Sequence, residues 1–172
     1  MVVFTIAVLG ALAYATSLAP PREADADTPA PVHMLVAGHS SKALDVPGAD
    51  DRPGTRLVQW RAHGGDNQLF RTLPFVTGDL NFVIIRSVET GHVLDMGPGQ
   101  GDPVFQGPWT GSASQVWWVA SFGATRYALF VNMGSGHVLE VEGSSLADGA
   151  AIVQSPWRGG ANQLWRAAII ID

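Results

Sequence analysis

Short apolar runs, bounded by Gly, Pro, Asp or Ser, follow one another along most of the chain. Their β-branched, aliphatic and aromatic residues and their short lengths predict β-strands. The predicted strands cover residues 33–37, 42–46, 56–60, 68–71, 82–86, 93–95, 103–106, 115–119, 127–131, 138–141, 151–154 and 163–166. No long window shows the periodicity of an amphipathic helix. The pattern therefore predicts an all-β domain.

A threefold repeat organises these strands. Each copy contains Leu followed by an acid, then an apolar-Gln pair, then Gln-x-aromatic, and its two glutamines are nine residues apart. The acids are Asp45, Asp95 and Glu140, and the closing motifs are Gln68-Leu69-Phe70, Gln115-Val116-Trp117 and Gln163-Leu164-Trp165. A unit of this size cannot bury its own apolar face and packs against its siblings. We therefore expect a closed pseudo-threefold structure with four strands in each of three repeats, at about 33–76, 77–123 and 124–170.

Charge and composition narrow the function classes. The net charge is −5, Lys42 is the only lysine, and the arginines are spread along the chain. This balance argues against nucleic acid as a partner, since that binding depends on neutralising phosphates. The chain has no Cys, so it has neither a disulfide framework nor a thiolate nucleophile.

The amino terminus forms a separate segment. An uncharged apolar run within residues 1–19 precedes a stretch rich in Pro, Ala and Asp at 20–32, which is typical of an extended linker. Three interpretations are open for the run: a cleaved signal peptide with Ala13-Tyr14-Ala15 as the small-x-small site, an uncleaved signal anchor, or a core element of the domain. Export is favoured, so we expect a secreted, extracellular protein that meets a membrane only if the segment remains as an anchor.

The triplicate Leu-Asp and Gln-x-Trp pattern resembles the ricin B-chain type of β-trefoil lectin over nearly all of residues 33–170. The resemblance implies a β-trefoil in which the Gln-x-Trp motifs are mainly structural, with the aromatic in a shared core and the glutamine tying backbone together. Gln68, Gln115, Gln163, Phe70, Trp117 and Trp165 are interpreted in this way.

Repeat 1 holds the residue types that a sugar site needs. A sugar offers neighbouring hydroxyls to a carboxylate and an amide, and an apolar C–H face to an aromatic ring. Leu44-Asp45-Val46-Pro47 with Trp60, His63 and Asn67 is similar to the xylan- and galactose-binding trefoil modules of secreted bacterial glycosidases. This implies that Asp45 and Asn67 grip adjacent hydroxyls, Trp60 stacks on the ring and His63 adds a hydrogen bond. The structural alternative is that Asp45 caps a turn and Trp60 fills surface space.

The other repeats are weaker copies of this set. Repeat 3 has Glu140 and Asn162, with Ser155 in place of Trp60 and Trp157 two positions later as a displaced stacking face. Repeat 2 has Asp95, a loop three residues shorter, Gly107 in place of Trp60, and Trp109 two positions on. The predicted order of importance is therefore repeat 1, repeat 3, repeat 2.

No catalytic constellation emerges from the sequence. His92 and His137 occupy the same repeat position, and neither a metal motif nor a nucleophile elbow is present. The sequence predicts a protein that is not an enzyme, uses no cofactor or metal, and binds glycans such as galactosides or xylan-like polysaccharides. Two alternatives remain: a trefoil subunit that binds a protein partner, as in toxin delivery, and a protease inhibitor, which the short loops disfavour.

Overall fold

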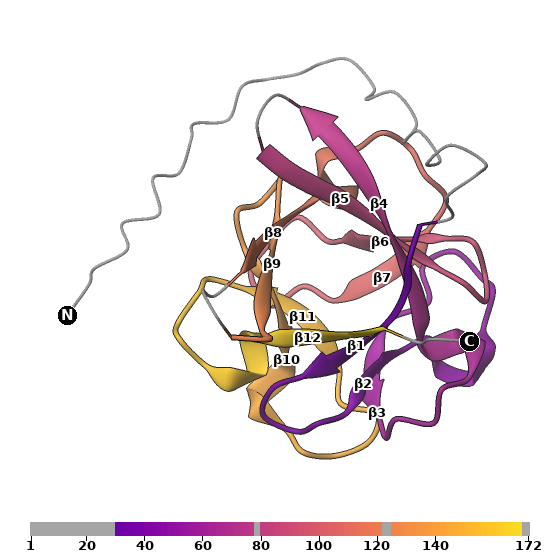
Figure 1. The fold of residues 1–172 in the computed structure, drawn as a ribbon, viewed down its shortest axis with the longest axis vertical. Helices are drawn as coiled ribbons and strands as arrows, with labels where there is room; N and C mark the ends of the chain where they lie inside the picture. The colour runs from indigo at the N-terminus through magenta and orange to yellow at the C-terminus, as the bar shows by residue number, and fades with distance from the viewer. Residues whose placement is uncertain (1–29, 78–79, 122–124, 170–172) are drawn as a thin grey trace.

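The computed structural model describes residues 30–77, 80–121 and 125–169 of the chain. The predicted signal segment (1–19) lies outside these residues, as does nearly all of the predicted linker (20–32). Within the described ranges, no helix has the length and apolar character needed to cross a membrane. The predicted all-β class is confirmed (Figure 1).

Twelve strands and five single 3-10 turns make up the described domain. The strands are β1 (Val32–Ala37), β2 (Ala43–Asp45), β3 (Val58–Trp60), β4 (Leu69–Thr77), β5 (Leu80–Ser87), β6 (Val93–Met96), β7 (Val104–Gly107), β8 (Trp117–Ser121), β9 (Ala128–Asn132), β10 (Val138–Val141), β11 (Ile152–Ser155) and β12 (Trp165–Ile169). The turns are η1 (Pro47–Ala49), η2 (Asp66–Gln68), η3 (Ala113–Gln115), η4 (Glu142–Ser144) and η5 (Ala161–Gln163).

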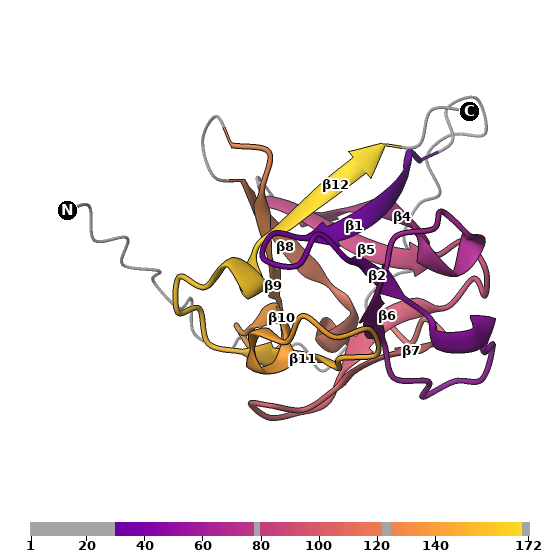
Figure 2. The same ribbon diagram turned by 90° about the horizontal axis from the view of Figure 1, so that it is seen from below.

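Six of these strands close into a barrel. Antiparallel pairing runs from β1 to β4, β5, β8, β9 and β12 and returns to β1, so each barrel strand has a partner on both sides. Figure 2 shows β12, β1 and β4 side by side at the point where the ring closes. Closure removes the exposed edges that an open sheet would present.

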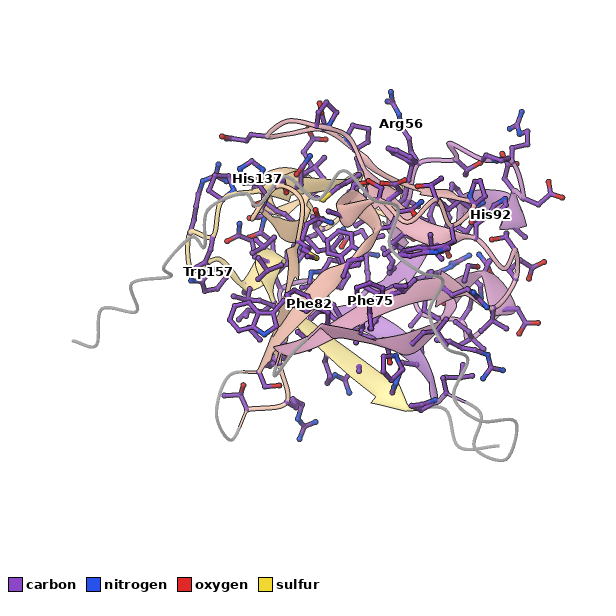
Figure 3. All side chains as sticks on the ribbon, turned by 90° about the horizontal axis from the view of Figure 1, so that it is seen from above. Arg56, Phe75, Phe82, His92, His137 and Trp157 are labelled. Carbon is purple, nitrogen blue, oxygen red and sulfur yellow. The ribbon has the colours of Figure 1, made fainter. Side chains whose placement is uncertain are left out.

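The other six strands form three hairpins, β2–β3, β6–β7 and β10–β11, one for each repeat. Isolated bridges join the hairpins to one another, from Arg56 to Phe105, from Val58 to Ala151 and from Pro103 to Val153. Arg56 projects outward from this end of the molecule (Figure 3). The hairpins therefore cap one end of the barrel as a connected triplet.

The core repeats the sequence period in three dimensions. Apart from Ala37, the buried cluster consists of equivalent triplets, with one residue from each repeat, packed around the pseudo-threefold axis. These triplets are Leu35, Ile85 and Phe130; Leu44, Leu94 and Leu139; Val46, Met96 and Val141; Leu57, Val104 and Ile152; and Phe70, Trp117 and Trp165. Because each repeat supplies only one member of every triplet, no repeat has a complete core alone.

The closing motifs differ from the prediction in their backbone. We expected Gln68, Gln115 and Gln163 to begin strands, but each is the last residue of a 3-10 turn, η2, η3 or η5. The turn puts the amide of the glutamine within reach of neighbouring backbone before the strand begins. The aromatic two residues later is then fully buried, as at Phe70, Trp117 and Trp165. The turn was not predicted because it is only three residues long and leads directly into a strand-like pattern.

The first glutamine of each repeat ties that repeat to a neighbour. Gln59 Nε2 donates to the carbonyls of Ser145 (2.7 Å) and Ala147 (2.9 Å) in repeat 3. Gln106 Nε2 of repeat 2 donates to the carbonyl of Asp50 in repeat 1 (2.6 Å). Gln154 Nε2 of repeat 3 donates to the carbonyl of Gly97 in repeat 2. The three buried amides therefore form a cyclic set of clamps between the repeats.

We expect Gln106→Leu to lower the free energy of unfolding by about 2 kcal/mol, because it leaves the Asp50 carbonyl and the Thr90 hydroxyl without their buried partner. Urea denaturation measures this change. Gln100→Leu, at an exposed turn position, is the matched control and should change stability by less than about 0.5 kcal/mol. Equal effects of the two substitutions would show that the clamp contributes nothing.

Candidate functional site

Repeat 1 contains a surface hollow with a volume of about 420 Å³. Its lining residues are Asp45, Pro47, Gly48, Ala49, Trp60, His63 and Asn67. The four side chains predicted from the sequence therefore lie around one hollow. Their role in ligand binding stays a prediction, but their proximity is a property of the structure.

Local structure explains how these residues meet. Asp45 ends β2 and Trp60 ends β3, and the two strands pair in register, with Asp45 opposite Val58 and Ala43 opposite Trp60. Asn67 lies in η2 and forms two hydrogen bonds with Val46. The backbone N–H of Val46 donates to the backbone carbonyl of Asn67 (2.9 Å), and Asn67 Nδ2 donates to the backbone carbonyl of Val46 (3.2 Å). Val46 leads directly into η1, where Gly48 has a φ of 65°, a value that favours glycine. This wall of the hollow was not predicted from the sequence.

Asp45 is held by the scaffold through only one of its oxygens. Its side chain is buried, and Oδ2 accepts hydrogen bonds from Gln68 Nε2 (2.8 Å) and Asn67 Nδ2 (3.1 Å). No hydrogen bond from the described residues reaches Oδ1. Burial raises the pKa of the Asp45 carboxyl, while the bond from Gln68, the charge of His63 and the bond from Asn67 oppose that rise.

His63 presents a donor to the same hollow. Its Nδ1 accepts the backbone N–H of Gly65 (3.1 Å), so the neutral imidazole carries its proton on Nε2. Nε2 lies 3.6 Å from Asp45 Oδ2, beyond a good hydrogen bond but close enough to share a hydroxyl with it. The backbone N–H of His63 donates to Gln68 Oε1 (2.8 Å), which fixes the loop that carries the ring.

Trp60 supplies an exposed aromatic face. It is 37% exposed, whereas its neighbour Gln59 is fully buried, as the alternation of a strand requires. Trp60 and Leu146 are the large apolar side chains found exposed among the residues whose burial the structure describes. The hollow thus combines an exposed tryptophan with a buried carboxylate that has one oxygen without a hydrogen bond from the described residues. A ring-shaped ligand with hydroxyls and one apolar face would need this combination.

Repeat 2 closes the corresponding position. Both oxygens of Asp95 are occupied, Oδ1 by the backbone N–H of Met96 (2.8 Å) and Oδ2 by Gln115 Nε2 (2.9 Å). Trp109 packs against Phe75, with ring centroids 6.1 Å apart and planes tilted by 56°. The structure therefore gives the Trp109 ring a packing contact, and Gly107 leaves the stacking position without a side chain.

Repeat 3 covers its acid with a cation. Glu140 Oε2 accepts from Gln163 Nε2 (2.7 Å) and from Arg158 Nη1 (3.4 Å), and Arg158 occupies the position of His63. Asn162 Nδ2 donates to the carbonyl of Val141 (2.9 Å), which matches the bond from Asn67 to Val46. The ion pair between Arg158 and Glu140 was not predicted. The presence of an arginine at the position of His63 was the sequence feature that could have indicated it.

The predicted stacking residue of repeat 3 also has another contact. Trp157 packs at the periphery of the molecule against the cluster of Leu129, Val131 and Val138 (Figure 3). The bonds from Gln163 to Pro156 O and from Arg158 N to Gln163 Oε1 align Trp157 with Ala62 of repeat 1. The residue aligned with Trp60 is the buried Ser155.

Metal binding has no support in this part of the molecule. In the described residues, His, Asp and Glu side chains do not gather in a group of three or more that would hold a metal ion. The hollow of repeat 1 combines one carboxylate, one amide, one imidazole and one indole. These groups offer hydrogen-bond donors and acceptors and one aromatic face.

A six-stranded barrel capped by three equivalent hairpins defines a β-trefoil, which is the class of this chain. A family model described as ricin-type beta-trefoil lectin domain-like matches residues 24–100, 75–154 and 113–171. The chain belongs to this family. A search of curated protein sequences gave no match.

Solved structures agree with this assignment. The designed threefold-symmetric protein ThreeFoil is 34% identical, with a TM-score of 0.75 over 81% of this chain and 99% of its own. An exo-β-1,3-galactanase from Clostridium thermocellum is 26% identical, with a TM-score of 0.76 over 81% of this chain and only 30% of the galactanase. The C-half of an earthworm R-type lectin, in complex with GalNAc, is 19% identical, with a TM-score of 0.64 over 81% and 99% of the two chains. The last of these shows the fold alone.

The raised pKa of Asp45 leads to a stability prediction. Because the folded state binds this proton more tightly than the unfolded state, stability decreases as pH rises through the window above about 3.9, the ordinary pKa of Asp. Asp45→Asn removes that charge and keeps an oxygen for Gln68 and Asn67. We expect its Tm at pH 7 to equal or exceed that of the unaltered protein, and the difference to vanish below about pH 4. Calorimetry at the two pH values measures this, and a Tm several degrees lower at pH 7 would contradict the burial argument.

Proposed function

We propose that this chain is a carbohydrate-binding protein whose main site is the hollow of repeat 1. The observation that carries the proposal is the buried carboxylate of Asp45, which has one oxygen without a hydrogen bond from the described residues and lines the same hollow as the exposed ring of Trp60. Membership of the ricin-type lectin-like family supports it.

Each polar group has a defined task in this proposal. Asp45 Oδ1 accepts one sugar hydroxyl, and His63 Nε2–H donates to the same or the adjacent hydroxyl oxygen. Asn67 donates its Nδ2 to Asp45 and Val46, which leaves its Oδ1 for a neighbouring hydroxyl. Trp60 contacts the C–H face of the ring. Neighbouring hydroxyls on one side and an apolar face on the other describe a pyranose.

Repeat 1 is proposed to act as the principal site because Asp95 is bonded through both oxygens and Glu140 is paired with Arg158, although Glu140, like Asp45, accepts hydrogen bonds from the described residues through one oxygen only. Asp95 has no oxygen without a hydrogen bond, and the charge of Glu140 is compensated by Arg158. A single open site of this kind binds weakly, so useful affinity on a natural target would come from repeated glycans or several copies of the protein.

Galactose-type sugars are the first class to test, and xylose-type polymers the second. Two of the similar structures carry galactose chemistry in their names, a galactanase and a lectin in complex with GalNAc. The site residues resemble those of galactose- and xylan-binding trefoil modules. The matched part is 30% of the galactanase chain, so its catalytic activity is not carried over.

We further propose that the protein is not an enzyme and acts outside the cell. Hydrolysis of a glycosidic bond needs two carboxylates facing the bond, and the described lining of the hollow contains one, Asp45. Export rests on the apolar amino-terminal run at residues 1–19. A processed amino terminus in protein recovered from the culture medium is the result that would support it.

A glycan-array screen of the whole chain tests the binding proposal. We expect binding to terminal galactosides or to xylan fragments, and a loss of about 10- to 100-fold in affinity for Asp45→Asn, since a hydrogen bond to a charged group contributes about 1.5–3 kcal/mol. Trp60→Ala should weaken binding to a similar degree. Titration calorimetry with the best array ligand gives the ratios.

Matched controls come from the pseudo-threefold symmetry and the surface. Asp95→Asn should leave sugar affinity unchanged, because the oxygens of Asp95 are bonded internally. Leu146→Ala removes an exposed apolar side chain like that of Trp60, but outside the hollow, and should also be silent. Equal losses for Asp45→Asn and Asp95→Asn would refute the assignment to repeat 1. Silence of the folded protein on the whole array would refute sugar binding and favour a protein partner.

A further inference from the structure

The loop between β10 and β11 of repeat 3 lies against the strand of repeat 1 that carries Trp60. The backbone N–H of Gln59 donates to the carbonyl of Ala150 (2.8 Å), and the N–H of Gly149 donates to the carbonyl of Gln59 (2.8 Å). A methyl group placed on Gly149 would lie 3.6 Å from Cζ3 of Trp60, so the edge of the indole is beside this glycine. The described lining of the hollow belongs to repeat 1, so this loop would act on the hollow through Trp60.

Asp148 in the same loop holds both strands of the repeat 1 hairpin at the end where Trp60 stands. Its Oδ1 accepts the backbone N–H of Arg61 (2.9 Å) and pairs with Lys42 Nζ. Arg61 directly follows Trp60, and Lys42 directly precedes Ala43, which is opposite Trp60 in the strand register. The hydrogen bond from Lys42 lowers the pKa of the Asp148 carboxyl below its ordinary value. The carboxylate is therefore charged at pH 7 and forms a strong bond to the Arg61 N–H.

The equivalent junctions between the other repeats cannot form this bond. At each of them a proline replaces Arg61, and proline has no backbone N–H to donate. The equivalent pairs are Pro53 with Pro108 and Gln100 with Pro156, in place of Asp148 with Arg61. The same two junctions have Gly107 and Ser155 in place of Trp60. The backbone bond across a junction thus occurs where the stacking position holds an aromatic ring.

We propose that Asp148 of repeat 3 is a positioning residue for the sugar site of repeat 1, because it fixes the direction in which Trp60 presents its ring. This role rests on the proposed function, since it concerns how that site holds a sugar. Trp60 is the last residue of β3, and the bond to Arg61 restrains the backbone just beyond it. Ordering a freely turning side chain on binding lowers affinity by about 2- to 10-fold. A site with a preordered ring therefore needs residues from two repeats.

Titrations of the full-length protein with methyl-β-galactoside and with xylotriose test this role, one probe for each sugar class. Asp148→Ala should lower affinity about fivefold, because the ring is no longer preordered. Asp148→Asn keeps an oxygen for the Arg61 N–H and should lower it less than about twofold. Gln100→Ala, at the equivalent position of repeat 2, is the matched control and should change nothing. Unchanged affinity in Asp148→Ala, or an equal loss in Asp148→Asn, would overturn the proposal.

A double-mutant cycle shows whether Asp148 acts through Trp60. In a Trp60→Ala background, Asp148→Ala should lower affinity less than about 1.5-fold, because the ring that it positions is absent. A general structural effect of Asp148 would instead lower affinity about fivefold in both backgrounds. That second result would overturn the positioning role.

Nuclear magnetic resonance of the protein without sugar separates this role from the proposed function. A nuclear Overhauser effect between the Gly149 α-protons and the Trp60 ring should be present in the unaltered protein and in Asp148→Asn, and should be lost in Asp148→Ala. Its persistence in Asp148→Ala would overturn the positioning role, whatever the sugar titrations give. Failure of the unaltered protein to bind either sugar would refute the proposed function, and the Trp60 resonances would still decide whether Asp148 orients the ring.

Discussion

The buried hydrogen bond from each closing glutamine to the acid of its own repeat is the interaction on which both scaffold and site depend. Gln68, Gln115 and Gln163 donate to Asp45, Asp95 and Glu140 over 2.7–2.9 Å, and each amide also donates to a backbone carbonyl of the preceding loop. A buried amide and a buried carboxylate satisfy each other, so losing either leaves the other unpaired at a cost of about 1–3 kcal/mol. The sequence interpretation treated the glutamines as structural and the acids as predicted binding residues. The two roles are not separate, because the glutamine fixes where the carboxylate points.

The same bond has three different outcomes, and neighbouring residues decide among them. In repeats 1 and 3 the acid accepts hydrogen bonds from the described residues through one oxygen only, and in repeat 2 the backbone N–H of Met96 bonds to the second oxygen. In repeat 3 Arg158 also pairs with the acid. The position of His63 is filled by Thr110 and by Arg158, and that of Trp60 by Gly107 and by Ser155. Folding constrains the glutamine and the acid in every repeat, while the stacking and donor positions are free to change. A shared framework thus holds three acids in three different surroundings.

Sequence reasoning succeeded where a residue type repeats with the core. The period of the glutamines and aromatics predicted the threefold closed fold and twelve strands, because each triplet has to meet at one axis. It also named Asp45, Trp60, His63 and Asn67, which the structure places around one hollow. It missed the 3-10 turns, the η1 wall and the bond from Met96 to Asp95, since these depend on backbone direction over two or three residues. Pattern alone does not show whether an acid at a matched position still has an oxygen free.

The hollow in this molecule arises where the three repeats differ in sequence. At the axis, the triplet of Leu44, Leu94 and Leu139 leaves no room for divergence, since a change of volume there would be felt by all three repeats. The hollow of repeat 1 lies instead where equivalent positions differ, at Trp60 against Gly107 and Ser155. A threefold protein of three identical repeats would carry either three copies of this hollow or none. The hollow is therefore a consequence of divergence at positions away from the shared core, where a change in one repeat does not disturb the other two.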